Sequence, residues 1–394
     1  MILRRFLIFL VGLSMPFNNV AIIPNFSMGL LSTACYFLAL EPYLSTVGEV
    51  DQHYGKFMWS IPLFIVLFTI INIMNQCGYN TPVFPFTLFM CFLLMLLQLV
   101  HCFYDRMALS YCMYGIAFGG VLMSILFALG IGITIGDDLR LVMFGENSNV
   151  LGIYMGLSSI VILNDFILND KLNLEKYRFL FLLAFIPIVA LLFATGSRTA
   201  FLIFALSVVL ILIFYPMNSV FGKLAFFVVG IMCCAYVFTK LESSDAILIQ
   251  RLTDTVEEGN TSGRDRITES LLPHVFESPI WGYGQTGYVE VAKKALNRIS
   301  VIGGVTYGYS PHNVIMELLM YTGCIGLFLW SVFWWHIGKE SWILFREKRL
   351  LLPVLMCIPM LANILSGQLL TAKWAYIIYA YIISEYYYFQ ESLH

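Results

Sequence analysis

The sequence predicts an all-α polytopic membrane protein with about twelve transmembrane helices and one large extracytoplasmic loop. Of its 394 residues, 60% are hydrophobic and 12% are charged, whereas roughly 25% of the residues in a soluble domain are charged. Apolar runs of about 20 residues, the length that crosses a bilayer as a helix, recur along the whole chain. Lysine and arginine are also distributed unequally between alternate connections, as in membrane proteins of fixed orientation.

The first predicted span begins close to the N-terminus. The opening MILRRFLIFL has the basic end and short apolar run of a signal peptide, but no small-residue cleavage site follows, so we interpret it as a retained helix. In chain order, the predicted spans are residues 6–23, 27–44, 57–74, 83–102, 108–135, 149–168, 179–195, 199–215, 223–239, 312–336, 350–369 and 374–390. They define three regions, which are helices 1–9 in residues 1–239, the extracytoplasmic loop in residues 240–311 and helices 10–12 in residues 312–394.

The basic residues of the short connections predict the orientation. If the N-terminus is cytoplasmic, the cytoplasmic segments hold twelve of them: Arg4, Arg5, Lys56, Arg106, Lys171, Lys176, Arg178, Lys223, Lys339, Arg346, Lys348 and Arg349. The short outer connections hold only three, namely Arg140, Arg198 and Lys373. Positive charge concentrates on the cytoplasmic side of membrane proteins, so both termini are predicted to be cytoplasmic and the large loop to lie outside.

Composition also narrows the function classes. The net charge of −2 gives no basic excess for binding nucleic acid. Nearly all of the nine cysteines lie in apolar runs and none lies in residues 240–311, so no disulfide framework is predicted for the loop. No spacing of Cys, His or carboxylates suggests a metal site, and no metal or other cofactor is predicted.

A first candidate site is Thr195-Gly196-Ser197-Arg198-Thr199-Ala200, between two apolar runs that almost touch. Gly196 can end one helix and Ser197 can cap the next. Arg198 then lies at a helix N-terminus, where backbone N–H groups and the helix dipole favour an anion. The alternative is a tight helical hairpin whose arginine extends towards the membrane surface.

A second candidate lies in the large loop, where Ser262-Gly263-Arg264-Asp265-Arg266 precedes Ser278-Pro279-Ile280-Trp281-Gly282-Tyr283-Gly284. Residues 267–276 between them are predicted to form a short helix along the membrane surface. The Gly, Pro and Trp residues that follow predict a turn-rich platform. The alternative is that the loop is a passive cap with solvated charges.

The third candidate, Tyr309-Ser310-Pro311-His312-Asn313, opens a long apolar run. Ser310 suits an N-cap and Pro311 the first helical position, so His312 is predicted in the first turn. A helix N-terminus disfavours imidazolium, which keeps the ring neutral and able to accept a proton. Asn313 and Glu317 are four residues apart and would share a helix face.

All three candidates are predicted on the outer side of the membrane. Two arginines and a neutral histidine there could bind a diphosphate and deprotonate a hydroxyl group.

In their order along the chain, these segments resemble the O-antigen polymerase and O-antigen ligase family of bacterial membrane glycosyltransferases. The resemblance covers roughly residues 140–335. Its carriers are GSRTA at 196–200, SGR at 262–264, SPIWGYG at 278–284 and PHNVIMELLMYTGCIG at 311–326. It implies a GT-C-like multi-pass protein of the bacterial inner membrane, with its active face extracytoplasmic.

The resemblance also implies a substrate and residue roles. The donor would be a glycan on undecaprenyl diphosphate, and the acceptor another glycan. Arg198 and Arg264 would hold the diphosphate and His312 would be the candidate base. The further substrate-binding candidates are Arg140, Arg266, Asn313, Glu317 and Ser197. Neither a nucleotide sugar nor a metal would be needed.

Three functions therefore stay open. The first choice is a polymerase that joins lipid-linked repeat units into O-antigen, capsule or exopolysaccharide. The second is a ligase that transfers polymer to lipid A-core or another acceptor. The third is a flippase or transporter of lipid-linked glycans, against which the sequence shows no internal repeat and few charges within its spans. Membrane lipids, a chain-length regulator and a flippase are expected partners of the polymerase.

Overall fold

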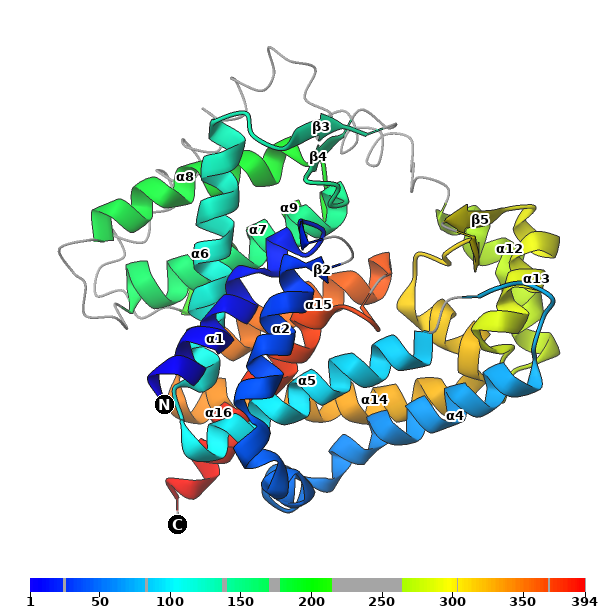
Figure 1. The fold of residues 1–394 in the computed structure, drawn as a ribbon, viewed down its shortest axis with the longest axis horizontal. Coiled ribbons are helices and arrows are strands. Elements are labelled where there is room, and N and C mark those ends of the chain that lie inside the picture. Colours follow the sequence, from blue (N-terminus) through cyan, green and yellow to red (C-terminus); the bar gives the residue numbers. More distant parts are fainter. Residues whose placement is uncertain are drawn as a thin grey trace. The chain divides into compact units, whose positions relative to one another are not determined.

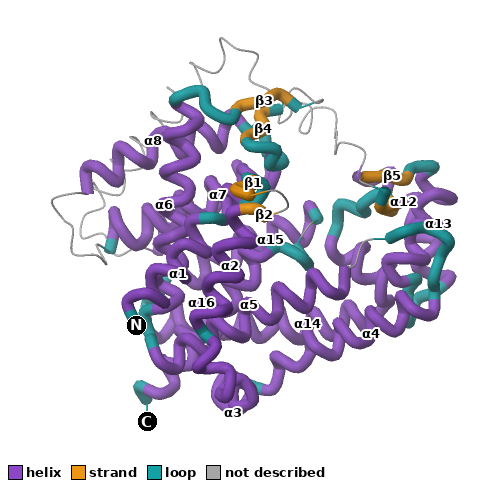
Figure 2. Tube along the Cα trace, viewed as in Figure 1, coloured by secondary structure: helices purple, strands orange, loops and turns teal. Residues whose placement is uncertain are grey.

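The computed structural model describes residues 1–23, 26–81, 84–136, 140–169, 178–214, 264–302, 304–367 and 369–393. Helices dominate these residues, and the strands pair only as three two-stranded antiparallel hairpins (Figure 1, Figure 2). The chain divides into two compact units. The first comprises Met1–Pro42, Tyr104–Gly259 and Leu344–Pro359, and the second comprises Tyr43–Phe103, Asn260–Ile343 and Met360–His394.

The first unit is built around packed apolar helices. Its elements are α1 (Ile2–Leu13), β1 (Ala21–Ile23), β2 (Phe26–Ser27), α2 (Met28–Ala39), α6 (Ala108–Ala128), β3 (Ile133–Ile135), β4 (Leu141–Met143), α7 (Ser148–Val161), α8 (Arg178–Ala194) and α9 (Arg198–Phe214). A π-helical turn at Ile162–Leu168 extends α7. Helices α1 and α6 approach closely at Gly12, Gly115 and Gly119, and a Cβ atom on Gly119 would lie 2.6 Å from the Leu13 carbonyl oxygen. Small residues of this kind allow membrane helices to pack backbone to backbone.

The second unit combines long helices with the described part of the large loop. Its elements are α3 (Val50–Tyr54), α4 (Ser60–Met74), α5 (Phe84–Tyr104), α12 (Arg264–Glu277), α13 (Gly284–Leu296), β5 (Ile299–Ile302), β6 (Val305–Gly308) and α16 (Lys373–Glu391). Most of α14 (Val314–Lys348) and the end of α15 (Leu352–Ser366) also belong to it. Phe68 of α4 stacks on Tyr321 of α14, with ring centroids 5.4 Å apart, so these two helices lie side by side.

Contacts at the two ends of the second unit agree with the predicted alternation of its helices. At the end that carries α12 and α13, here called the loop end, Asn72 of α4 accepts a hydrogen bond from the backbone N–H of Gln285 at 2.6 Å. At the opposite end, the Tyr54 hydroxyl donates to the Leu99 carbonyl oxygen at 3.0 Å. The Tyr388 hydroxyl of α16 donates to the Cys102 carbonyl oxygen of α5 at that same end. The segment before α4 therefore lies beside the C-terminal end of α5, as in antiparallel neighbours, whereas the C-terminal ends of α5 and α16 meet, as in parallel neighbours. Both relations are those that the predicted alternation requires.

Helix α14 is broken near its beginning. Gly323 has φ 62° and ψ −160°, which is far from helical geometry. The turn between α12 and α13 packs against this break, where the N–H of Cys324 donates to the Pro279 carbonyl oxygen at 2.8 Å. The break therefore frees backbone groups that the large loop satisfies.

The helices only partly match the predicted spans. Within the described residues, five helical stretches are long and apolar enough to cross a membrane: Lys56–Met74, Phe84–Tyr104, Ala108–Ala128, Ser148–Leu168 and Val314–Lys348. Shorter apolar helices cover Met28–Ala39, Leu180–Ala194, Arg198–Phe214 and Leu352–Ile364. The predicted span 223–239 and residues 240–263 of the loop lie outside the described residues. The structure thus supports a polytopic membrane protein and leaves the number of twelve spans a prediction.

Three predicted spans, 6–23, 27–44 and 108–135, extend into residues that form strands. Helices α1 and α2 have 12 residues each, or about 18 Å of helix, against a hydrocarbon core of about 30 Å. Pro16 stands in a 3₁₀ turn after α1, and β1 and β2 take up the residues between the two helices. The span predicted at 108–135 ends as a helix at Ala128, because residues 133–135 pair with β4.

Candidate active site

The turn between α8 and α9 forms as the sequence predicts. Gly196 has a positive φ of 63° and follows the end of α8. The Ser197 hydroxyl accepts the N–H of Ala200 at 3.3 Å, which makes Ser197 the N-cap of α9. Arg198 is the first residue of α9 and is half-buried. Ser197 has no exposed surface, so its hydroxyl serves the cap, and the substrate-binding role predicted for it gains no support from its position.

Helix α7 brings a second arginine to the same region of the first unit. A Cβ atom on Gly152 of α7 would lie 2.7 Å from the Ala200 Cβ and 3.1 Å from the Ser197 Cβ, so the α8–α9 turn rests on α7 there. One turn earlier on α7, Asn149 accepts a hydrogen bond from Arg140 Nη1 at 3.0 Å. Arg140 and the start of α9 are therefore both placed near the N-terminal end of α7.

Glu146, at this end of α7, belongs to no sequence motif that would distinguish it. Only 7% of it is exposed. Burial raises the pKa of its carboxyl group to about 7, although the N–H of Asn147 donates to it at 3.3 Å. A carboxyl group with a pKa close to neutral can exchange protons near physiological pH, which makes Glu146 a further candidate for acid–base chemistry.

His312 lies just before α14, not in its first turn as predicted. The helix begins at Val314, and the Asn313 side-chain oxygen accepts the N–H groups of Ile315 at 2.9 Å and Met316 at 3.2 Å. Asn313 is therefore the N-cap, because its amide oxygen is better placed than the Ser310 hydroxyl to satisfy the first turn. Ser310 instead accepts the N–H of His312 at 3.2 Å.

The backbone at His312 has an unusual conformation that its surroundings fix. Its φ is 52°, in the left-handed region that residues other than glycine seldom occupy. Gly367, after α15, packs against it, and a Cβ atom there would lie 3.0 Å from the His312 Cα. Strained backbone conformations of this kind concentrate at functional sites.

The structure places His312 within the electrostatic influence of Arg264. The His312 ring is half-buried, and both its burial and the Arg264 charge lower its pKa, burial having the larger effect. The neutral ring that the sequence predicted is thus favoured, but by burial and a cation more than by a helix N-terminus. Arg264 itself is the first residue of α12 and is half-buried.

A third basic residue of the second unit lies near this pair. The Tyr309 ring packs edge-on to the His312 ring with centroids 5.6 Å apart. The guanidinium carbon of Arg298 lies 5.4 Å from the centre of the same tyrosine ring. Arg298 belongs to the loop, where the sequence offered no motif to distinguish it from the other basic residues.

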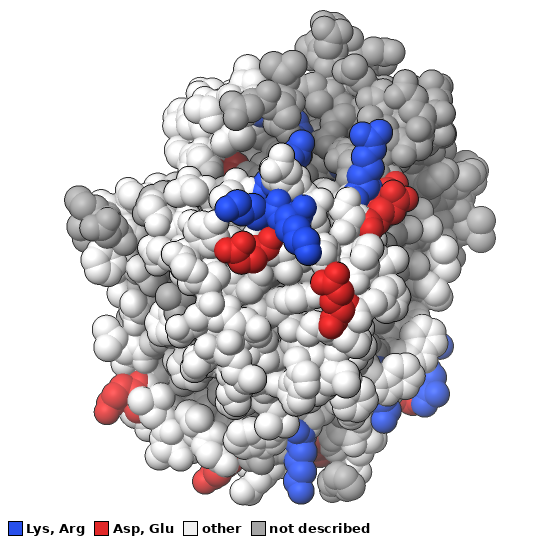
Figure 3. Space-filling model, turned by 90° about the vertical axis from the view of Figure 1, so that its right-hand side faces the viewer, with Lys and Arg blue, Asp and Glu red and all other residues white. Residues whose placement is uncertain are grey.

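The remaining predicted residues of the second unit occupy different settings. Glu317 is buried in α14, 8% exposed, and interacts with the Tyr321 hydroxyl. Arg266 is exposed on α12. Figure 3 looks onto the face where α12 and α13 lie, and it shows basic and acidic side chains gathered there within largely uncharged surroundings. The exposed charged residues of this part of the loop are Asp265, Arg266, Glu269, Glu277, Glu290, Lys293, Lys294 and Arg298.

The predicted site residues divide between the two units. Arg140, Ser197 and Arg198 belong to the first, and Arg264, Arg266, His312, Asn313 and Glu317 belong to the second. Within the described parts of the chain, no group of three or more His, Cys, Asp or Glu residues could hold a metal ion. That the protein needs no metal stays a prediction.

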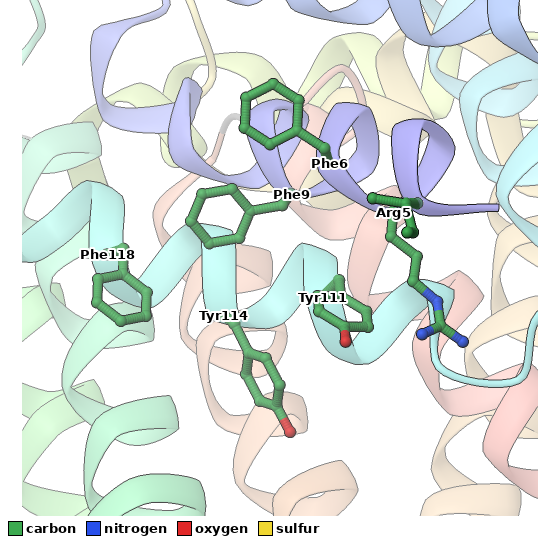
Figure 4. Close-up of a pocket in the computed structure, with 7 residues that line it drawn as sticks. Arg5, Phe6, Phe9, Tyr111, Tyr114 and Phe118 are labelled. Atoms are coloured by element: carbon green, nitrogen blue, oxygen red, sulfur yellow. The ribbon is translucent and has the colours of Figure 1, made fainter. Parts of the chain in front are cut away.

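A groove of about 370 Å³ in the first unit is lined by none of the predicted site residues. It runs between α1 and α6 and is lined mainly by aromatic side chains (Figure 4): Ile2, Arg5, Phe6, Phe9, Tyr111, Tyr114 and Phe118. Arg5 at its edge is paired with Asp105, with Nη2 and Oδ1 2.8 Å apart. The groove therefore lies at the N-terminal ends of α1 and α6, and an apolar lining with a neutralised arginine does not suit a diphosphate.

The comparison with protein families gives a match that covers every predicted site residue except Arg140. Residues 182–331 match the family model described as O-antigen ligase. Residues 182–331 are a domain of the O-antigen ligase family. All four sequence segments that carry the resemblance lie inside this O-antigen ligase domain, as do Arg198, Arg264 and His312. Among curated proteins, none matches the chain significantly.

Membership of the domain in this family sets the coarse function. Family members are glycosyltransferase-like enzymes of polysaccharide assembly, with ligase- or polymerase-type activity. The apolar helices and the O-antigen ligase domain together indicate a membrane protein of this class.

Proposed function

We propose that the chain is a polymerase that joins undecaprenyl-diphosphate-linked repeat units into a surface polysaccharide. It would act at the outer leaflet of the bacterial inner membrane, on O-antigen, capsule or exopolysaccharide units. One observation carries the proposal: within the O-antigen ligase domain, the cation Arg264 acts electrostatically on the half-buried His312. A cation for the leaving group and a neutral base for the nucleophile are the two functions that glycosyl transfer from a diphosphate requires.

The proposed reaction is a displacement at the anomeric carbon of the donor. A hydroxyl oxygen of the acceptor glycan forms a bond to that carbon, and the bond from the carbon to the diphosphate oxygen breaks. The lipid diphosphate leaves with the electron pair. Nε2 or Nδ1 of His312 accepts the hydroxyl proton, and Arg264 stabilises the charge that develops on the diphosphate. The planar guanidinium group can bind two phosphate oxygens at once, which a lysine ammonium group cannot do.

The first unit offers the same chemistry for a phosphate. Arg198 stands at the N-terminus of α9, where backbone N–H groups and the helix dipole favour an anion. Arg140 is held near the N-terminal end of α7 by Asn149. We assign both arginines to the binding of the donor's anionic group, and Ser197 to the cap that positions Arg198.

The other predicted residues take supporting roles in this proposal. Asn313 fixes the start of α14 directly after His312. Glu317, one turn later, is buried with Tyr321 and supports the same turn. Arg266 is exposed and would contact the glycan rather than the reacting atoms.

A ligase is the second candidate, because the matched model is described as O-antigen ligase. The same residues would act in the same way, with lipid A-core or another acceptor in place of a second lipid-linked glycan. The two activities differ only in the acceptor, so the acceptor decides between them.

The test is reconstitution of the purified protein in liposomes with an undecaprenyl-diphosphate-linked repeat unit. A polymerase converts the donor alone into products of two and more repeat units, measured by mass spectrometry. A ligase leaves the donor unchanged until a lipid A-core acceptor is added. If the donor is consumed in neither experiment, the proposal is wrong.

A further inference from the structure

An apolar surface at the end of α12 has no partner within the described chain. It comprises Leu272, Phe276, Ile280 and Trp281, which are 43%, 73%, 54% and 55% exposed. Leu272 and Phe276 are four residues apart and therefore lie on one face of α12. Ile280 and Trp281 follow in the turn before α13. We call these four residues the apolar edge, and we propose that it inserts into the outer leaflet of the membrane and anchors the extracytoplasmic loop there.

The charge pattern along α12 supports an anchor at one end of the helix. Asp265, Arg266 and Glu269, all exposed, lie in its N-terminal half. On the same exposed side, the C-terminal half carries Leu272 and Phe276. Glu277, next to Phe276, is also exposed, but its carboxylate lies 2.9 Å from His274 Nδ1 and accepts a hydrogen bond from the Tyr283 hydroxyl at 3.2 Å. The face of α12 that carries Asp265 and Glu269 thus becomes apolar at Leu272 and Phe276, which fits a helix whose C-terminal end contacts lipid.

Backbone contacts fix the level of the apolar edge along α14. The run of α14 without Asp, Glu, Lys or Arg extends from Leu318 to Gly338. At the rise of an unbroken helix it would span about 31 Å, close to the roughly 30 Å of the hydrocarbon core. The carbonyl oxygen of Pro279 accepts the N–H of Cys324, and that of Ile280 accepts the N–H of Ile325. These contacts lie inside the uncharged run, about 9 Å from its outer end.

Contacts with α4 independently indicate the same depth of the apolar edge in the membrane. Asn72 in the last turn of α4 accepts a hydrogen bond from the backbone N–H of Gln285. Gln285 lies four residues after Trp281 in the sequence. Ile73 and Met74 beside Asn72 are 63% and 77% exposed, as expected for a lipid-facing helix end. The apolar edge therefore continues the apolar exterior of the helices, at a depth within the roughly 5–10 Å to which interfacial apolar residues insert.

A bilayer explains this surface better than a protein partner does. The edge is continuous with helix surface that lipid must cover, and its depth suits apolar residues that insert from the membrane surface. The anchor would also fix the height of Arg264, because the 14 residues of α12 place its two ends about 20 Å apart along the helix.

The test measures whether lipid or water surrounds the edge in the full-length protein. The native cysteines are replaced, and Phe276→Cys and Ile280→Cys variants are spin-labelled and reconstituted in phosphatidylethanolamine and phosphatidylglycerol liposomes. Glu269→Cys and Lys294→Cys, exposed positions on α12 and α13, serve as matched controls. Relaxation by oxygen, which partitions into lipid, is compared with relaxation by a polar nickel chelate.

We expect oxygen to dominate at residues 276 and 280 and the nickel chelate to dominate at residues 269 and 294. Nickel access at 276 and 280 equal to that of the controls would overturn the proposal, because the edge would then be in water. Exclusion of both reagents from 276 and 280 would also overturn it, since a second protein chain would cover them.

Labelling of the unmodified protein with a lipid-borne diazirine gives the second measurement. Peptides covering 272–281 should be labelled and those covering 286–298 should not.

Discussion

The backbone N–H of Tyr283 donates a hydrogen bond to the Met320 carbonyl oxygen at 2.7 Å. This bond joins the turn after α12 to α14 just before its break at Gly323, and the Cys324–Pro279 bond joins them just after it. Two segments that carry the family resemblance, SPIWGYG and PHNVIMELLMYTGCIG, are thus held together by their main chains. These bonds therefore fix α12 to α14. Helix α12 begins at Arg264, and α14 begins two residues after His312.

Gly323→Ala should disrupt this connection. The backbone at Gly323 has a positive φ, and a Cβ atom would overlap the Ile280 carbonyl group. We expect a loss of about 3 kcal/mol in the free energy of unfolding, measured by thermal denaturation of the purified protein in detergent. Gly338→Ala in the same helix is the matched control, because no atom lies within 4 Å of the added methyl group. Equal unfolding temperatures for the two variants would show that the break in α14 is not a packing requirement.

Arg264 should lower the pKa of His312. An unperturbed histidine has a pKa of about 6.5, and both burial and the Arg264 charge disfavour its protonated form. The neutral ring should therefore persist below pH 6.5, and Arg264→Gln should raise the pKa because one of the two causes is removed. The measurement is the pH dependence of His312 modification by diethyl pyrocarbonate, which reacts with the neutral ring, followed by mass spectrometry.

Arg266→Gln provides the control for that titration, since Arg266 is an exposed arginine two residues further along α12. The modification curve of His312 should be the same in this variant as in the wild type. A curve that does not move in Arg264→Gln either would contradict the effect of the Arg264 charge on His312.

Glu146→Gln should stabilise the protein more at alkaline pH than at acidic pH. The folded-state pKa of about 7 lies above the ordinary glutamate value of 4.5, so the folded state holds the proton to a higher pH than the unfolded state does. Ionisation of Glu146 therefore destabilises the fold as the pH rises through this range, and glutamine removes that cost. The stability difference between variant and wild type should grow by up to about 2 kcal/mol from pH 5 to pH 8.5. A difference independent of pH would show that Glu146 ionises normally.

Fusions of alkaline phosphatase should report the orientation of the second unit. Twelve basic residues on one side against three on the other predict that the loop is extracytoplasmic. A fusion after Asn297 should therefore be enzymatically active, because alkaline phosphatase folds only outside the cytoplasm, and a fusion after Lys348 should be inactive. The reverse pattern would place the candidate site on the cytoplasmic side.

Local sequence patterns anticipated the turn at Gly196 and Ser197, because the helix end and the cap depend on adjacent residues. They misplaced the start of α14, since Ser310, Pro311 and Asn313 all suit a helix start. In the structure α14 begins at Val314, and Gly367, about fifty residues later in the sequence, packs against His312 just before that start. Hydropathy likewise overestimated the spans at α1 and α2, because it does not register that residues 21–23 and 26–27 pair as strands.

Features that depend on distant parts of the chain had no local signal. Three such features are the burial of Glu146, the contact of Arg298 with Tyr309 and the pairing of residues 278–284 with α14. Each depends on segments that are separated in the sequence. The glycines at 282 and 323 indicated special backbone geometry, but not that each lies against the segment containing the other. The elements of the site were therefore predictable one by one, and their connections were not.

The most direct test of the central claim is the turnover of His312→Gln with the lipid-linked donor in liposomes. If His312 accepts the proton of the acceptor hydroxyl, the release of undecaprenyl diphosphate should fall by about 10²–10⁴-fold. The affinity for the donor should stay close to that of the wild type, because Arg264 is unchanged. Turnover within a few-fold of the wild-type rate would contradict the account, since a glutamine cannot accept that proton.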